Sequence, residues 1–208
     1  MRFEKRKYRL TGITKLLGSQ PANPAIRTAY VASKAPNQGK ADDETDHLPE
    51  DLDSLNLSVF LRNKGSLCIS DYVVKGFLKE AGKVMKGQIG IAQPASKVDN
   101  FVLIEPMYLT LWREGEEIDV ADGDFERPLR AQTMQGERVT VVASEYVLPP
   151  WQVEFEITLL ENEKTARSVA LDFEAIESML DYGQIKGLGQ WRNGQNGRFT
   201  WERIDEHD

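Results

Sequence analysis

The segment WQVEFEITLL, at residues 151–160, alternates apolar and polar side chains without interruption. Its apolar residues are Trp151, Val153, Phe155, Ile157 and Leu159, and the polar ones between them are Gln152, Glu154, Glu156 and Thr158. A period of two over this length is typical of a β-strand that lies against a core on one face and meets water on the other. We therefore expect a strand here, with its apolar side chains turned inward.

Two other segments carry the period of an amphipathic helix. Residues 70–85 place Val74, Phe77, Leu78, Ala81 and Met85 on one stripe, with Ser70 as the expected N-cap. Residues 168–181 place Val169, Phe173, Ile176 and Leu180 on another, with Ser168 as the expected N-cap and Gly183 as the stop. We expect a helix over each range.

The remaining apolar runs are short and are predicted to be strands. They lie at residues 8–17, where Gly12 marks a bulge or a close backbone approach, at 101–112, interrupted at Pro106, at 137–148 and at 198–204. The resulting order, without two insertions at about 33–54 and 114–136, is that of a β-α-β-β-α-β, ferredoxin-like (RRM-type) unit of the α+β class. We expect one domain spanning 1–208.

Charge and composition narrow the class of protein. The chain has 208 residues, a formal net charge of -7 and a pI of about 5.1. That balance argues against a protein that coats nucleic acid through overall positive charge, although a local basic groove remains compatible with it. The single cysteine, Cys68, excludes an intrachain disulfide and favours a reducing cytoplasm, and no apolar run approaches the length of a membrane span.

One segment departs from this acidic background. Residues 187–199, GLGQWRNGQNGRF, contain four glycines and two arginines, and no acidic residue occurs from 182 to 201. The segment fails the Rossmann fingerprint, because Arg192 stands where the third glycine belongs and the helix precedes the loop. It fails the Walker pattern as well, because Gln195 and Asn196 follow Gly194 where lysine and serine or threonine are required.

A loop that contacts nucleic acid fits the segment better. Closely spaced glycines let backbone amides approach phosphates, arginines contact phosphates or stack on bases, and Trp191 offers a ring to an unstacked base. The alternative is a glycine-rich turn in which Trp191 belongs to the core and the arginines are solvated. A second basic run, Arg2, Lys5, Arg6, Lys7 and Arg9, either extends a basic path toward this loop or is a solvated terminus.

The segment resembles the C-terminal glycine-rich loop of the RAMP superfamily, the repeat-associated proteins of CRISPR effector complexes. The resemblance is carried by Gly187, Gly189, Arg192, Gly194, Gly197, Arg198 and Phe199, and by the position of the loop between the second helix and the last strand. A weaker match is GSLCISDYVVKGFLKEAG at 65–82, where Lys75 and Gly76 correspond to a lysine-glycine pair of the first helix. The resemblance does not extend to either of the two insertions.

The resemblance implies a non-catalytic protein that binds the RNA sugar-phosphate backbone next to other protein subunits of a ribonucleoprotein. The RNA would be a guide RNA or another single-stranded nucleic acid, and no membrane is involved. The implied contact residues are Gly187, Gly189, Gln190, Trp191, Arg192, Asn193, Gly194, Gly197 and Arg198 in the loop, and Lys75 and Lys79 in the first helix.

No catalytic residue, metal ligand or cofactor is assigned. The only histidines, His47 and His207, lie in the first insertion and next to the C-terminus, and none of the aspartates between 42 and 53 aligns with a catalytic position of the family. Two alternatives remain open. One is a protein-interaction module on the same fold, borne by a virus or plasmid and acting on a nucleic-acid complex. The other is a guide-processing endoribonuclease.

Overall fold

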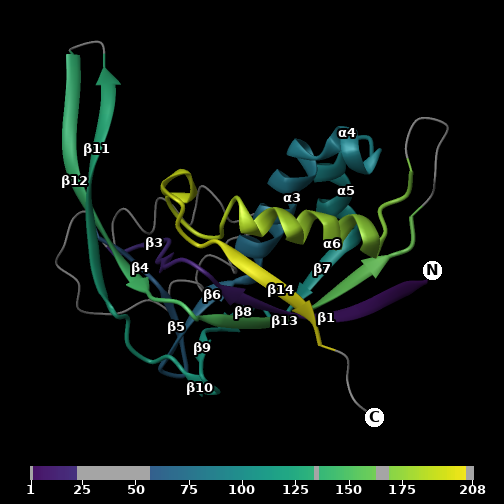
Figure 1. Cartoon of the computed structure of the whole chain (residues 1–208), viewed down its shortest axis with the longest axis horizontal. Helices are drawn as coiled ribbons and strands as arrows, with labels where there is room; N and C mark the ends of the chain where they lie inside the picture. The colour runs from purple at the N-terminus through teal and green to yellow at the C-terminus, as the bar shows by residue number, and fades with distance from the viewer. Residues whose placement is uncertain (1, 23–56, 134–135, 163–168, 205–208) are drawn as a thin grey trace, which may run out of the picture.

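The computed structural model describes residues 2–22, 57–133, 136–162 and 169–204. Within these ranges the chain is a mixed α+β protein with several antiparallel sheets (Figure 1). In chain order the elements are β1 (Phe3–Gly12), β2 (Leu16–Leu17), β3 (Gln20–Pro21), β4 (Leu57–Val59), β5 (Leu61–Asn63), β6 (Ser66–Ser70), α3 (Asp71–Val84), α4 (Lys86–Ile89), α5 (Pro94–Phe101), β7 (Val102–Glu105), β8 (Tyr108–Thr110), β9 (Trp112–Arg113), β10 (Glu116–Glu117), β11 (Gly123–Thr133), β12 (Gly136–Val147), β13 (Gln152–Leu160), α6 (Phe173–Asp181), the 3-10 turns η1 (Tyr182–Gln184) and η2 (Arg192–Gly194), and β14 (Phe199–Arg203).

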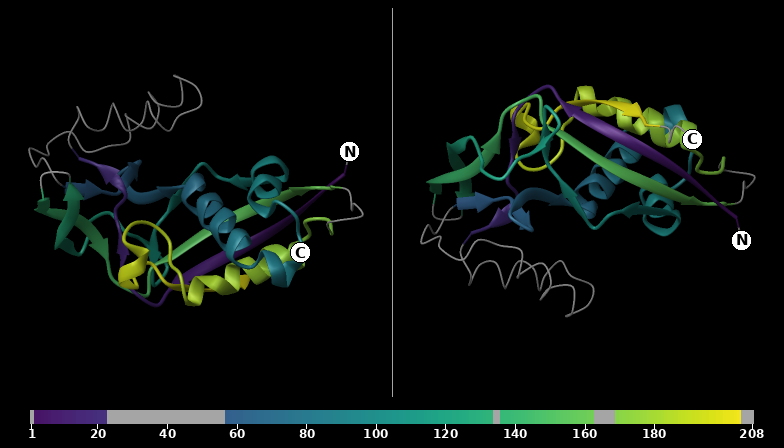
Figure 2. Two further views of the ribbon diagram at one scale, coloured as in Figure 1. Left: turned by 90° about the horizontal axis from the view of Figure 1, so that it is seen from above. Right: turned by 90° about the horizontal axis from the view of Figure 1, so that it is seen from below.

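The largest sheet has β1 and β13 at its centre. β14 pairs with the free side of β1, β7 pairs with the far side of β13, and all three pairings are antiparallel. β9 also joins β13 at Gln152, and β10 pairs with β9. Tyr8 and Phe155, which are opposite each other in the register, are both buried, and the core they belong to includes Phe77 of α3 and Ile176 of α6. Helices α3 and α6 therefore cover one face of this sheet and leave the other open (Figure 2).

Two further sheets stand beside the first. One joins β11, β12, β4 and β3, and the other joins β5, β6 and β8. The β11–β12 hairpin rises from one end of the molecule, away from α3 and α6 (Figure 1). Its base is tied down by an ion pair in which Arg113 of β9 contacts Asp122, whose carboxylate also accepts a hydrogen bond from the backbone of Leu148. Both ends of the hairpin are thereby fixed to the main sheet.

Most strand predictions agree with the structure. The alternating segment is β13, and all five of its inward residues are buried. The run at 101–112 is interrupted at Pro106, and the run at 198–204 contains β14. Gly12 is a close approach, since a Cβ there would lie 2.1 Å from the Trp151 ring. The first strand was placed too late, because β1 begins at Phe3 and residues 16–17 form the separate β2.

The helix boundaries agree less well. α3 matches the predicted range, and Ser70 occupies the N-cap position without making a side-chain cap bond. The prediction for the second helix was wrong at its start, because α6 begins at Phe173 rather than at 168. Asp172 is its N-cap, with the carboxylate accepting from Ala175 N, so Val169 lies before the helix and is exposed.

The two predicted insertions have different outcomes. The insertion at 33–54 lies outside the described residues. The one at 114–136 contains β10 and the whole of β11, so a stretch that reads as acidic and turn-rich supplies a long strand instead. The pairing of β11 with β12 along its length, from Gly123 opposite Tyr146 to Thr133 opposite Gly136, explains this, because cross-strand pairing overrides a weak local preference.

Candidate nucleic-acid interface

The two ends of the glycine segment close on each other. Leu188 N donates to Gly197 O at 2.9 Å, Gly197 N donates to Lys15 O at 2.7 Å, and the Leu188 side chain is fully buried. A Cβ on Gly187 would lie 2.2 Å from Asn196 O, and Gly197 has a positive φ of 71°. Gly187 and Gly197 are therefore required by the close approach of two backbone segments, and they do not face an outside ligand.

Between these ends an arc of chain is presented to solvent. Trp191, Asn193, Gly194 and Gln195 are exposed, and η2 forms its turn. The arc is supported from within by Asn196, a buried residue whose amide donates to Trp191 O at 3.1 Å and to Gly194 O at 3.3 Å. The segment thus separates into a buried base and an exposed arc held in one shape.

The arc meets helix α3 through an ion pair. Arg192 Nη1 lies 2.5 Å from Glu80 Oε2, and Lys186 Nζ lies 3.5 Å from the other oxygen of the same carboxylate. Lys186 also donates to Asn193 Oδ1 at 2.7 Å. Glu80 thereby holds the loop beside α3 and partly neutralises both cations.

Three other predicted contact residues serve the protein itself. Arg198 Nε donates to Gln184 O at 2.7 Å, so its side chain is bound within the loop that leads to it. Gln190 donates to Ser58 Oγ and accepts from Arg127, which joins the segment to β4 and β11. At Gly189, with φ at 73°, a Cβ would lie 3.0 Å from the backbone of β2. The contact roles predicted for these residues stay predictions, and each has an internal role as well.

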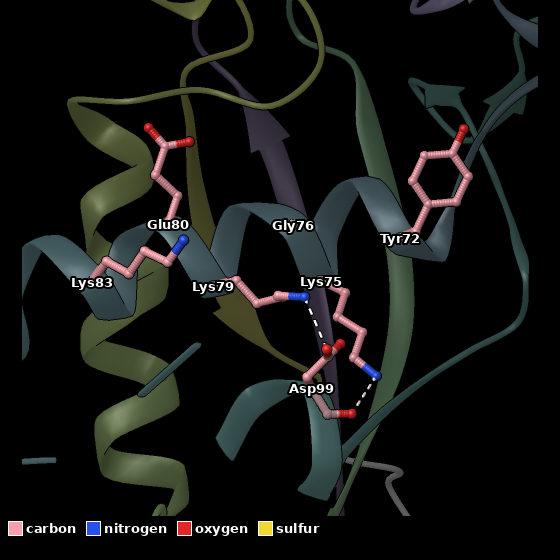
Figure 3. Close-up of a pocket in the computed structure, with 7 residues that line it drawn as sticks. All are labelled: Tyr72, Lys75, Gly76, Lys79, Glu80, Lys83 and Asp99. Atoms are coloured by element: carbon pink, nitrogen blue, oxygen red, sulfur yellow. Dashed lines mark hydrogen bonds and ion pairs between the residues drawn. The ribbon is translucent and has the colours of Figure 1, made fainter. Parts of the chain in front are cut away.

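Helix α3 carries an open groove beside the arc. The groove has a volume of about 470 Å³ and is lined by Tyr72, Lys75, Gly76, Lys79, Glu80, Lys83 and Asp99. Lys75 Nζ donates to the backbone oxygen of Asp99, and Lys79 Nζ lies 3.1 Å from its carboxylate, whereas Glu80 points away from Asp99 (Figure 3). Lys83 makes no ion pair with any residue that the structure describes. The two predicted helix lysines therefore contact α5 through Asp99, and the loop is joined to the groove through Glu80.

Charge is unevenly distributed around this groove. The cations of the groove and arc are Lys75, Lys79, Lys83, Lys186 and Arg192, and the carboxylates facing them are Glu80 and Asp99. Among these residues three positive charges remain uncompensated, in a chain whose net charge is -7. The summed charge of these residues is therefore opposite in sign to the net charge of the chain.

On the open face of the main sheet, unlike in the groove, carboxylates outnumber cations. Lys5 pairs with Glu156, and Arg9 pairs with both Glu154 and Glu202. With Lys7 and Glu105 on the same face, four carboxylates meet three cations. Lys5 and Arg9 of the N-terminal basic run are thus paired with carboxylates of neighbouring strands, which disfavours a basic path from this run toward the glycine loop.

Reasoning from sequence missed several residues of this region. Lys83 follows Lys75 and Lys79 at helical spacing, so the four-residue period would have found it. Glu80 and Asp99 were missed because their role depends on which elements lie together in space. His47, His207 and the aspartates between 42 and 53 lie outside the described residues.

The described part of the chain holds neither a candidate metal site nor a candidate membrane-spanning helix. No group of three or more histidine, cysteine, aspartate or glutamate side chains in residues 2–22, 57–133, 136–162 and 169–204 is arranged to hold a metal ion. No helix within those ranges combines the length and the apolar character needed to cross a bilayer.

Comparisons with known proteins gave matches among solved structures. No family model matches the sequence, and no curated protein matches it. Among solved structures, the chain is similar to a chain of the cryo-EM structure of the type III-B Cmr-beta bound to cognate target RNA, at 12% identity and a TM-score of 0.49. The match covers 98% of this chain and 61% of that chain, so this chain spans less than two thirds of the other. A likeness at this level does not establish a common fold.

Proposed function

We propose that this chain is a non-catalytic RNA-binding protein of the RAMP type. It contacts the sugar-phosphate backbone of a guide RNA or another single-stranded RNA as one subunit of a CRISPR effector-type ribonucleoprotein in the cytoplasm. Its partners are the RNA and neighbouring protein subunits. The contact surface comprises the exposed arc of the glycine segment, centred on Arg192 and Asn193, and the outer face of α3 with Lys75, Lys79 and Lys83.

The strand order supports the ferredoxin-like part of this proposal. If the main sheet is reduced to β1, β7, β13 and β14, and the helices to α3 and α6, the chain order is β-α-β-β-α-β. The spatial order is then β14-β1-β13-β7, antiparallel throughout, with both helices on one face. On this view the hairpin β11–β12 and the smaller sheets are additions to that unit.

The observation that carries the proposal is the position of the arc against α3. Lys75, Lys79 and Lys83 line the groove, and Arg192 and Lys186 pair with Glu80, which also lines it. Lysine and arginine side chains spaced along a groove follow a polyphosphate backbone without reading its sequence. A Cβ on Gly194 would lie 3.1 Å from the Asn196 amide nitrogen and 3.3 Å from the Trp191 ring, so the absence of a side chain there lets the arc pack on itself.

Direct binding by the full chain tests the proposal. Fluorescently labelled single-stranded RNA is titrated at low salt with the wild type, with a Lys75→Gln/Lys79→Gln/Lys83→Gln variant and with an Arg2→Gln/Lys5→Gln/Lys64→Gln control of equal charge. We expect the α3 variant to bind roughly tenfold or more weakly, and the control to stay close to the wild type.

Two results would contradict the proposal. If the wild type does not bind RNA at low salt, a protein-interaction module on the same architecture becomes the better account. If the α3 variant and its control weaken binding equally, only the net charge matters and the groove is not the site.

A further inference from the structure

Two cations next to the glycine segment lack a carboxylate partner within the described chain. Arg127 of β11 and Lys15, between β1 and β2, make no ion pair there. Five other arginines of the described chain form ion pairs, whereas Arg198 donates to the backbone oxygen of Gln184: Arg6 pairs with Glu4 and Glu177, Arg9 with Glu154 and Glu202, Arg62 with Glu145, Arg113 with Asp122, and Arg192 with Glu80. In so acidic a protein, two cations held apart from carboxylates need a physical explanation.

Both cations lie on aromatic rings. Lys15 Nζ is 3.3 Å from the centroid of Phe125, and the Arg127 guanidinium carbon is 4.8 Å from the centroid of Trp191. The Phe125 and Trp191 rings are themselves in contact, with centroids 5.5 Å apart and planes inclined by 38°. These four residues come from three separate segments and form one cluster, which we call the aromatic-cation cluster.

Arg127 is the buried member of the cluster. Its residue is only 6% exposed, its Nη atoms donate to Ser144 Oγ and Gln190 Oε1, and its Nε has no hydrogen-bond partner. Burial lowers the pKa of this guanidinium because water no longer stabilises its charge. Burying a cation beside neutral groups alone is costly, so an anion close to this cluster would stabilise it.

The cluster also has an accessible surface. Trp191 is 39% exposed although it contacts Arg127 and Phe125, and it belongs to the exposed arc described above. Gln190, the residue before it, is held by Ser58 and Arg127, and the hairpin that carries Phe125 is fixed at its base by Asp122. Gln190 and the hairpin therefore hold the exposed indole in a fixed position before any ligand binds.

We propose that the aromatic-cation cluster binds one unstacked nucleobase of the RNA against the exposed part of the Trp191 ring, with the adjoining phosphate drawn to the partly exposed Lys15. The inference rests on the proposed function and adds a base-binding site to a surface otherwise assigned to the backbone. Aromatic rings stack any base, and nearby cations favour the attached phosphate, so the site is selective for an unpaired nucleotide and tolerant of its sequence.

The experiment uses the full chain and single-stranded RNA that carries 5-iodouridine, which crosslinks on irradiation to an aromatic side chain stacked on it. We expect the crosslinked peptide to contain Trp191 or Phe125. Trp191→Ala is expected to weaken RNA binding roughly tenfold with an unchanged dependence on salt, and Trp191→Phe to retain most of the affinity. Lys15→Gln is expected to lower the slope of log affinity against log salt by about 0.7, the value for one phosphate contact on a single strand.

The outcomes separate the two proposals. If RNA binds with the expected salt dependence, but no crosslink reaches Trp191 or Phe125 and Trp191→Ala binds like the wild type, the base site is refuted and the backbone-binding function stands. Absence of RNA binding overturns both. If Trp191→Ala fails to fold, as judged from its urea midpoint, the crosslink to the wild type and the Trp191→Phe affinity still decide the matter.

Discussion

Gly187 and Gly197 pack backbone against backbone, so closely that a Cβ on Gly187 would lie 2.2 Å from the carbonyl carbon of Gly197. Together they close the base of the segment that presents Trp191 and Asn193 to solvent. The glycines that suggested a phosphate-contacting loop from sequence thus have two different roles. Gly187 and Gly197 shape the loop from within, and only Gly194 lies on the exposed arc.

Substitution of either buried glycine is expected to destabilise the protein. Gly187→Ala and Gly197→Ala each force apart two backbone segments, and the second also places a side chain at a positive φ, so we expect a loss of about 1–3 kcal/mol in the free energy of unfolding. Urea denaturation measures this. Gly76→Ala is the matched control, because a Cβ there meets open space within α3 and should stabilise by up to about 1 kcal/mol. Equal effects at all three positions would contradict the close backbone contact assigned to Gly187 and Gly197.

Removal of the carboxylate between the loop and α3 is expected to strengthen RNA binding. Glu80→Gln frees Arg192 and Lys186 and removes one negative charge from the groove, so affinity should rise by roughly threefold to tenfold at low salt. Stability should change by less than about 1 kcal/mol, because this ion pair is partly exposed. A titration against Glu116→Gln, which removes the same charge from an exposed hairpin, provides the comparison. Weaker binding by Glu80→Gln would mean that the ion pair, and not the free cations, shapes the site.

The clamp at the base of the β11–β12 hairpin predicts a dependence of stability on pH. The hydrogen bond from Arg113, followed by that from Leu148 N, holds the pKa of Asp122 below its usual range. Because the folded value lies below the unfolded one, near 3.9, the stabilisation is fully present above that pH and is lost as pH falls through the folded value. Asp122→Asn should therefore be less stable than the wild type by up to about 1 kcal/mol at neutral pH, and the gap should narrow in acid.

Urea midpoints of both proteins across an acid pH series measure this gap. Asp124→Asn, two positions along β11 and exposed, serves as the control, since its side chain makes no ion pair with another described residue. A gap that stays constant down to acid pH would show that the Asp122 charge does not stabilise the hairpin base.

The sequence allowed much of the main sheet to be predicted. The alternation in 151–160 predicted β13 with its buried face, and the apolar stripe from Val74 to Ala81 predicted α3, because in both cases the periodicity follows from a boundary between core and water. The start of α6 was misplaced because Ser168 and Asp172 are both acceptable caps, and only tertiary packing selects one. β11 was missed because its pairing partner, not its own composition, makes it a strand.

The candidate site was only partly predictable. The loop was singled out because its composition departs from the acidic background, and Lys75 and Lys79 were implied by the resemblance to the RAMP superfamily. The ion pairs of Glu80 that join loop and helix, the internal bond of Arg198 to Gln184 and the cluster of Arg127 with Trp191 depend on contacts between residues far apart in the sequence. No local pattern contains such contacts.

The central claim is that phosphates bind in the groove on the outer face of α3, next to the glycine segment, and its most direct test is the salt dependence of RNA binding. Affinity of single-stranded RNA is measured over a salt series for the wild type, for Lys75→Gln/Lys79→Gln/Lys83→Gln and for the Arg2→Gln/Lys5→Gln/Lys64→Gln control. The slope of log affinity against log salt should be shallower by about 2 in the α3 variant, because each lost contact on a single strand removes about 0.7, and unchanged in the control. An α3 variant with the wild-type slope would contradict the claim.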